Sequence, residues 1–301
     1  MDITTRKELF EKLVDLVCEF DRVCKEHSIT YYAFAGTMLG AIRHKGIIPW
    51  DDDIDLMVPR KDYNKLKEVA SQGAFKYPYF FQSPETDQGY PKGFSRLRNS
   101  ETTEIAFIDF AMNCNHGVFL DIFPLDNIPD DKKLFHRQVK QLQLLRLMMN
   151  CGARLHSDIG SEDLNSHRKI LFYCFKPLFK MQILSLGKLF RYYEKIASKY
   201  DGTKCTYVGT VTFSGENQRF IYETNWLSGE TIECDFEGKR IPIPEYYDAI
   251  LKKSYGDYMT PVQEPTNHGD VLFSSTIPYG QFIRDHYEEL KNGWYKCRKK
   301  Q

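Results

Sequence analysis

The N-terminal part of the chain changes from a helical to a strand-like hydrophobic pattern. Apolar residues recur at helical spacing from Thr5 to His27, and the short apolar run from Tyr31 to Ala35 predicts a strand. A helical stretch from Met38 to His44 follows. A second strand is expected from Asp53 to Val58, where acidic residues alternate with apolar ones, because successive strand side chains point to opposite faces.

Further along, strands and helices alternate before the pattern becomes mainly helical. The expected elements are a helix at Arg60–Ala70, strands at Tyr79–Gln82, Phe94–Arg98 and Gly117–Phe123, and helices at Asp131–Asn150 and Leu164–Lys199. The C-terminal part predicts strands at Tyr207–Phe213 and Ile232–Ile241 and a helix at Pro244–Tyr255. This order predicts an α+β fold with an α/β-like catalytic core at 1–130, a helical insertion at 131–204 and a mixed part at 205–301 that packs on the core.

Closely spaced carboxylates are the main chemical feature of this pattern. Asp53 and Asp55 are expected on one face of their strand, while Ile54 and Leu56 point into the core. Two carboxylates held this close repel each other, so one takes up a proton unless a cation lies between them. Hard oxygen ligands suit Mg²⁺ or Mn²⁺ and leave room for substrate phosphates. The segment therefore predicts a metal-dependent phosphoryl-transfer site, with Asp51 in a supporting or base role.

Three other interpretations of the acidic segment are less favoured. A solvated loop is typical of acidic runs, but apolar residues are interleaved here. A calcium loop of the EF-hand type would need Gly where the chain has Leu56 and Glu where it has Asp62, and Pro59 interrupts it. Capping of the helix that begins near Arg60 would need an acid closer to that helix.

A single acid, Asp121, lies within the apolar strand predicted at Gly117–Phe123. A buried carboxylate costs several kcal/mol unless it is paired or bound to a metal. Two interpretations stay open: Asp121 pairs with an Arg or with backbone donors, or it is a third metal-facing carboxylate from a neighbouring strand.

Composition limits the class of protein. Lys plus Arg and Asp plus Glu both number 41 among 301 residues, so the formal net charge is +0 and a globally basic nucleic-acid-binding protein is disfavoured. The eight cysteines show neither C-x-x-C spacing nor a zinc-like cluster, which is typical of free thiols in a reducing compartment. The N-terminus has no apolar signal-peptide core, and no window predicts a transmembrane helix. We expect a cytoplasmic protein that does not bind nucleic acid.

Four stretches of the chain resemble one known family. They are GTMLGAIRHKGIIPWDDDIDL, FSRLRNSETT, GVFLDIFPLD and PEYYDAILKKSYGDYMTP. The first closely resembles the LicD-type family of nucleotidyltransferase-fold proteins, which includes the fukutin-related glycan phosphotransferases. The region 134–203 shows no such match. The zinc-binding cysteines of the fukutin-related branch have no counterpart in this chain, so no zinc is expected.

The resemblance implies a nucleotidyltransferase-like core in which a G-[S/T] turn and a D-x-D strand bind metal and the phosphates of a nucleotide-linked donor. Gly36 and Thr37 match the turn, Asp53 and Asp55 match the metal ligands, and Asp121 matches the third acid. Members of the family transfer a substituted phosphate, typically phosphocholine from CDP-choline, onto a sugar hydroxyl of a surface glycan. A glycan or a lipid-linked glycan is therefore the expected acceptor.

Other residues are candidates for substrate contacts. The basic candidates for phosphate binding are Arg43, His44, Lys45, Arg96 and Arg98. Aromatic residues that could contribute to a cage for a quaternary ammonium group are Trp50, Tyr79, Phe80, Tyr90, Trp226, Tyr246 and Tyr247. Asp51, Asp121 and His268 are the alternatives for the general base.

A basic, apolar stretch indicates contact with a membrane surface. From Leu164 to Tyr193 the chain has no Asp or Glu, while Lys and Arg lie among Phe, Leu and Ile. This composition suits a helix at the surface of an anionic membrane, and the inner membrane face is the expected location. A lipid-linked acceptor would be found there. A buried helical hairpin with extended lysine side chains is an equal alternative.

Several related functions fit the same residues. The donor could carry phosphoethanolamine, phosphoribitol or phosphoglycerol in place of phosphocholine. A nucleotidyltransferase that uses CTP or ATP would release pyrophosphate instead of CMP. A non-catalytic binding module for glycans or nucleotides is disfavoured, because all three acids are present.

Overall fold

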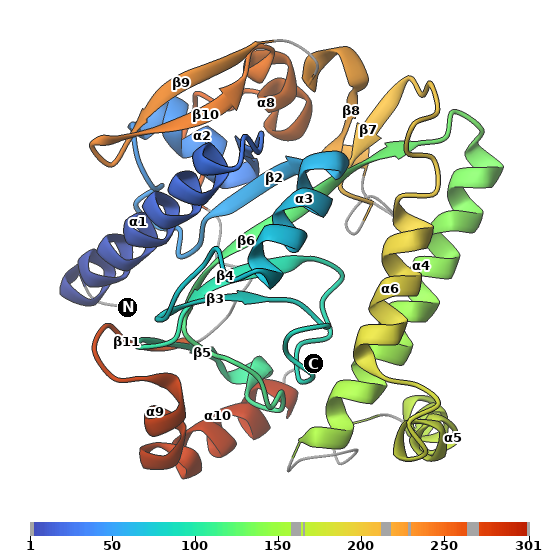
Figure 1. Ribbon diagram of the computed structural model, residues 1–301. Coiled ribbons are helices and arrows are strands. Elements are labelled where there is room, and N and C mark those ends of the chain that lie inside the picture. Colours follow the sequence, from blue (N-terminus) through green and yellow to red (C-terminus); the bar gives the residue numbers. More distant parts are fainter. Residues whose placement is uncertain are drawn as a thin grey trace.

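A mixed β-sheet forms the centre of the molecule (Figure 1). The computed structural model describes residues 3–157, 164, 166–211, 218–227, 230–263 and 271–299. Within these residues the sheet has the order β1-β2-β6-β4-β3, and β7 and β8 continue from β6. Its strands are β1 (Tyr32–Ala33), β2 (Asp55–Pro59), β3 (Tyr79–Gln82), β4 (Ser95–Asn99), β6 (Val118–Ile128), β7 (Tyr207–Gly209) and β8 (Ile221–Glu223).

The long strand β6 organises this sheet. It pairs in parallel with β2 and antiparallel with β4 and β7. Nearly all of its residues are buried, which agrees with its almost continuous apolar sequence and with a sheet covered on both faces. The two registers place Asp121 between Asp55 of β2 and Arg96 of β4.

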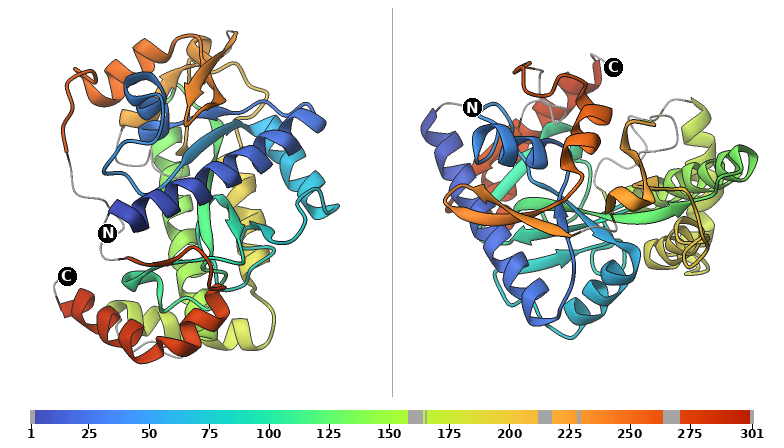
Figure 2. Two further views of the ribbon diagram at one scale, coloured as in Figure 1. Left: turned by 90° about the vertical axis from the view of Figure 1, so that its left-hand side faces the viewer. Right: turned by 90° about the horizontal axis from the view of Figure 1, so that it is seen from above.

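Helices and a hairpin cover the two faces of the sheet (Figure 2). The covering elements are α1 (Ile3–Glu26), α2 (Ala35–His44), α3 (Arg60–Ser71), α8 (Tyr247–Tyr255), β9 (Thr231–Phe236) and β10 (Lys239–Pro244). Helices α1 and α3 pack on one face, and α2 and α8 lie on the other side together with the hairpin. Leu9, Leu13 and Phe20 recur at helical spacing on α1 and are fully buried, so this helix is held by its apolar face.

A helical part extends from one edge of the sheet (Figure 1). It contains α4 (Lys132–Ala153), α5 (Ser166–Lys180) and α6 (Leu186–Ala197). Asp131 caps α4, since its carboxylate accepts hydrogen bonds from the backbone N–H groups of Lys133 and Leu134 at 2.7 and 3.1 Å. Met149, Phe190 and other buried residues give α4 and α6 a hydrophobic core separate from that of the sheet.

The C-terminal segment lies against the chain between β4 and β6. Strand β11 (Val271–Ser274) pairs antiparallel with β5 (Thr103–Ala106). Helices α9 (Tyr279–Asp285) and α10 (Tyr287–Lys299) follow, and α10 packs against the 3-10 turn Phe107–Asp109. Leu290 is buried there with Ile105 and Phe282, and Trp294 is buried in a neighbouring cluster with Ala111, so residues from distant parts of the chain pack together.

The predicted α+β fold class, with a mixed sheet flanked by helices, is confirmed. Several boundaries differ from prediction; the strand expected at 207–213, for example, ends at Gly209. The expected helix at 164–199 is two helices, because the chain turns at Gln182, whose φ is 56°, and Ser185 caps α6. The expected strand at 232–241 is a hairpin, because Glu237 and Gly238 both have positive φ. Strand β2 begins at Asp55, so Asp53 precedes it.

A buried ion-pair network joins the sheet to the helical part. The Arg60 guanidinium donates to both carboxylate oxygens of Asp126 at 2.6 and 2.8 Å, and its third nitrogen donates to Glu194 on α6 at 2.9 Å. Arg60 and Asp126 are almost fully buried. Loss of one partner from a buried pair leaves an uncompensated charge, which costs more than the pair contributes.

We expect Arg60→Met to lower the free energy of unfolding by about 3 to 5 kcal/mol, because the Asp126 carboxylate would stay buried without its cation. Urea unfolding measures this change. The control is Lys61→Met at the neighbouring exposed position, which should change stability by no more than about 0.5 kcal/mol. Equal stability of the two variants would show that the network does not hold these elements together.

Candidate active site

The turn into α2 brings backbone close to the acidic segment. Ala35, the first residue of α2, has a φ of 45°, which is uncommon for a residue other than glycine. Gly36 follows, and a Cβ atom on it would lie 2.8 Å from Oδ2 of Asp51. The absence of a side chain at Gly36 therefore lets the Asp51 carboxylate lie against the start of α2.

Thr37 connects this turn to β2. Its hydroxyl oxygen accepts a hydrogen bond from the backbone N–H of Asp55 at 2.8 Å. The N–H of Phe34 donates to the Asp55 carbonyl at 2.9 Å, so both backbone groups of Asp55 are bound by the turn. Thr37 is 5% exposed, and in this structure its hydroxyl positions β2. The predicted contact of Thr37 with phosphate stays a prediction.

Three consecutive carboxylates form a compact cluster beside Gly36. One oxygen from each of Asp51, Asp52 and Asp53 lies within 4.8 Å of the others. Burial and the charges of Asp55 and Asp51 raise the pKa of Asp53 well above its usual value. Carboxylates forced together in this way favour a hard divalent cation, so the donor set fits Mg²⁺ or Mn²⁺.

Asp55 and Asp121 form the second part of the acidic site. They are register partners in the parallel pair β2–β6 and therefore project from the same face of the sheet. The Asp121 carboxylate accepts hydrogen bonds from Arg96 at 2.5 and 3.3 Å. The structure thus shows the arginine pair that was one interpretation of Asp121, and it also places this carboxylate beside Asp55.

The two arginines of β4 are buried beneath this part of the site. Arg96 is bound to Asp121, and its guanidinium carbon lies 3.7 Å from the ring centre of Phe119. Arg98 donates to the side-chain oxygen of Gln82 at 2.6 Å and to the Gly117 carbonyl at 2.5 Å. Burial, and then the charge of Arg96, lowers the pKa of Arg98.

The other basic candidates lie at the far end of α2. Arg43 donates to the Tyr258 carbonyl at 2.8 Å, and His44 contacts the edge of the Trp50 ring at a centroid distance of 5.9 Å. Lys45 is exposed and ends α2 in the left-handed conformation. His268 lies outside the described residues. Contact of these residues with the substrate stays a prediction.

The aromatic residues considered for a choline cage lie in different places. Trp50 contacts His44, and Trp226 lies 5.9 Å from the Lys253 ammonium group. Phe80 lines a cavity at β3 and α9. Tyr90 lies 5.7 Å from the Arg96 guanidinium, which is also flanked by Phe94 and Phe119. The rings nearest Asp121 therefore surround an arginine.

Sequence reasoning missed two residues close to the acidic segment. The Tyr255 hydroxyl is near enough to Asp55 and Asp51 for their charges to contribute, after burial, to the raised pKa of this tyrosine. The guanidinium carbon of Arg219 lies 4.1 Å from the Tyr255 ring centre. Tyr255 falls within the family-like stretch PEYYDAILKKSYGDYMTP, so a signal existed for it, whereas Arg219 carried none.

Two adjoining cavities open beside Asp121. The first has a volume of about 260 Å³ and is lined by Asp121, Arg96 and Arg98 from the sheet and by Arg146 and Asn150 from α4. The second, of about 480 Å³, continues along α4. They share Lys92, Asp109, Asn150 and three other lining residues. Together they lead from the sheet toward the beginning of α5, where Leu164 and Arg168 line the second cavity.

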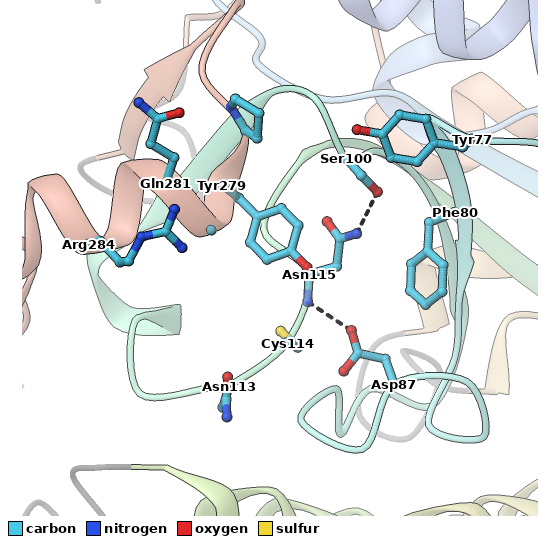
Figure 3. Close-up of a pocket in the computed structure, with 12 residues that line it drawn as sticks. Tyr77, Phe80, Asp87, Ser100, Asn113, Cys114, Asn115, Tyr279, Gln281 and Arg284 are labelled. Atoms are coloured by element: carbon cyan, nitrogen blue, oxygen red, sulfur yellow. Dashed lines mark hydrogen bonds between the residues drawn. The ribbon is translucent and has the colours of Figure 1, made fainter.

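Figure 3 shows a third cavity, of about 770 Å³, between β3 and α9. Tyr77, Phe80 and Tyr279 line it, and Asn115 donates from its side chain to Ser100 at 2.8 Å within it. Apart from Phe80, one of the aromatic residues considered for a choline cage, its lining includes none of the residues predicted for the site.

Comparisons with known proteins identify the family of the central region. Residues 28–143 match a family model described as LicD/FKTN/FKRP, nucleotidyltransferase domain. The chain is 26% identical over 259 residues to the lipopolysaccharide cholinephosphotransferase LicD of Haemophilus influenzae, a match that covers 84% of this chain and 92% of that protein. An uncharacterized protein of Rickettsia prowazekii is 37% identical over 60 residues, which is 20% of this chain and 23% of that protein. The predicted resemblance to LicD-type transferases is confirmed.

Gly36→Ala should lower the turnover rate by about ten- to a hundredfold, because the new Cβ atom would displace the Asp51 carboxylate. Folding stability should not fall, since Ala is favoured over Gly in a helix by about 1 kcal/mol. Turnover and thermal unfolding are measured together. The matched control is Gly187→Ala at the second position of α6, where the nearest atom would lie 3.6 Å away. Unchanged turnover of Gly36→Ala would contradict the importance of this close approach.

Proposed function

Residues 28–143 are a nucleotidyltransferase domain of the LicD family, and on this premise we propose that the chain transfers a substituted phosphate from a CDP-linked donor onto a hydroxyl of a glycan. Phosphocholine from CDP-choline is the proposed donor group, because the relative that covers most of the chain is a cholinephosphotransferase. The acceptor is a cell-surface glycan or its lipid-linked precursor.

The observation that carries this proposal is the carboxylate cluster against the Gly36 turn. Asp51, Asp52 and Asp53 supply the hard oxygen donors for a divalent cation, with Asp55 adjacent. Such a cation neutralises the charge of the donor phosphates, which is the main requirement of phosphoryl transfer. The backbone at Gly36 allows close approach of an anionic group to the first turn of α2.

Asp121 is the proposed general base for the acceptor hydroxyl. Its carboxylate lines the first cavity, where an acceptor could enter beside the acidic cluster. Arg96 fixes the orientation of this carboxylate through two hydrogen bonds, and a carboxylate retains further lone pairs for the proton of a hydroxyl. Asp51, the alternative base, lies against Gly36 on the cation side of the site.

Asp53→Asn should lower the release of CMP from CDP-choline by about a hundredfold, which corresponds to roughly 3 kcal/mol of lost transition-state stabilisation. Chelation of divalent cations in the unaltered protein should have the same effect. Asp15→Asn on the exposed surface of α1 is the control. Release of pyrophosphate from CTP in place of CMP from CDP-choline would favour a nucleotidyltransferase, and full activity of Asp53→Asn would overturn the metal assignment.

The surface of α5 is the proposed contact with an anionic membrane. Ile170, Tyr173, Met181 and Ile183 are each more than half exposed, and Lys176 and Lys180 lie among them. The second cavity begins beside this helix at Leu164 and Arg168, so a lipid-linked acceptor could reach it from the membrane. No helix in the described ranges combines the length and apolar character needed to cross a bilayer.

Lys176→Gln combined with Lys180→Gln should weaken binding to vesicles that contain phosphatidylglycerol by roughly thirtyfold, since each juxtamembrane lysine contributes about 1 kcal/mol. Flotation of the protein with vesicles measures the binding. Neutral phosphatidylcholine vesicles and a Lys61→Gln, Lys65→Gln double variant on α3 serve as controls. Binding that does not depend on anionic lipid would contradict this contact.

A further inference from the structure

The cavity beside Asp121 contains more positive than negative side chains. Its charged lining residues are Lys92, Arg96, Arg98, Arg146, Glu104, Asp109 and Asp121. His116 also lines it, but burial lowers the pKa of His116 to about 4, so this ring adds no charge at neutral pH. This excess of positive charge adjoins the acidic cluster of Asp51, Asp52 and Asp53, whose charge has the opposite sign.

Arg98 is a buried cation that forms no ion pair among the described residues, although the charge of Glu104, which lines the same cavity, acts on it. Its side chain is 2% exposed, and its hydrogen bonds go to the uncharged oxygens of Gln82 and Gly117. Among the described residues, no carboxylate oxygen lies within 4 Å of it, and its second terminal nitrogen has no hydrogen-bond partner. A buried guanidinium in this state favours an anion, because burial of an unpaired charge is costly.

Lys92 is a second cation of this cavity that forms no ion pair within 4 Å among the described residues. It is half-buried and lines both cavities, so it stands where they meet. Its charge acts on Asp109, which lines both cavities. Burial raises the pKa of this carboxyl group, but the positive charges around it, Lys92 first and then Arg96, lower the pKa by more. A positive potential therefore extends from the base of the cavity to its junction with the second one.

This cavity lies apart from the residues that are proposed to bind the metal and the donor phosphates. The linings of the two cavities contain none of Gly36, Thr37 and residues 51–55. Asp121 is the shared element, since it lines the first cavity and is the register partner of Asp55. A donor whose phosphates bind the cation would therefore lie on one side of Asp121, and a ligand in the cavity would lie on the other side.

We propose that this cavity binds an oxyanion, a phosphate or a carboxylate, carried by the acceptor glycan. The proposal rests on the proposed function, because that function places an acceptor hydroxyl beside Asp121. A neutral glycan would leave Arg98 without a direct ion pair, whereas an anionic sugar supplies one and orients its neighbouring hydroxyl. The donor phosphates are the other source of an oxyanion, and they are distinguished from the acceptor by experiment.

The test is calorimetric titration of the full chain with glucose 6-phosphate in the presence of EDTA, with glucose as the neutral control. Without divalent cations the acidic cluster repels anions, so binding reports on the cavity. Glucose 6-phosphate should bind at least about tenfold more tightly than glucose, and Lys92→Gln should remove about tenfold of that affinity. Lys65→Gln on α3 should leave the affinity unchanged.

Four results would overturn the proposal. These are equal affinity for glucose and glucose 6-phosphate, equal affinity of Lys92→Gln and Lys65→Gln, loss of binding in Asp53→Asn, and displacement of glucose 6-phosphate by stoichiometric CMP, which would assign the cavity to the donor. CMP release from CDP-choline is measured separately with Mg²⁺. Failure of that release would count against the proposed function alone and would leave the anion-binding result intact.

Discussion

The parallel pairing of β2 with β6 is the constraint on which the rest of the site depends. It brings Asp55 and Asp121, which are far apart in sequence, to one point of the sheet. The turn before α2 is fixed to the same point, because both backbone groups of Asp55 bind Phe34 and Thr37. Several carboxylates are thereby held close together, so one of them takes up a proton unless a cation lies between them.

Strand β6 also connects the site to the rest of the molecule. Successive side chains of β6 point to opposite faces of the sheet, so Asp121 binds Arg96 on one face and Asp126 binds Arg60 on the other. Both are buried ion pairs, and each ties β6 to a neighbouring element. The second pair reaches α6 through Glu194, so the helical part that borders the cavities is anchored to the strand that carries the proposed base.

The site is divided into an acidic half and a basic half. The acidic half lies at the Gly36 turn, where a cation and the donor phosphates are proposed to bind. The basic half lies in the cavity between β4 and α4, where Arg98 is buried and forms no ion pair among the described residues. This division suits a transfer reaction between two substrates, because each can be recognised by a different charge pattern on its side of Asp121.

Local sequence was enough to predict the fold class, most of the central strands and the acidic segment, because these depend on hydrophobic period and on short runs of residues. It was not enough for the pairs formed across strands. The choice between an arginine partner and a metal role for Asp121 depended on the β4–β6 register, and the strands β5, β8 and β11 were not predicted because they are short and gain their stability from distant partners.

The sequence by itself determined that this protein carries closely spaced carboxylates next to a Gly-Thr turn, and its motifs identified the family. Only the tertiary structure decided that Asp52 joins the cluster, that Arg96 pairs with Asp121, and that Arg98 lies in a cavity without an ion pair among the described residues. The physical reason is that the charge around a buried group is set by neighbours from several strands and helices, which no local pattern encodes.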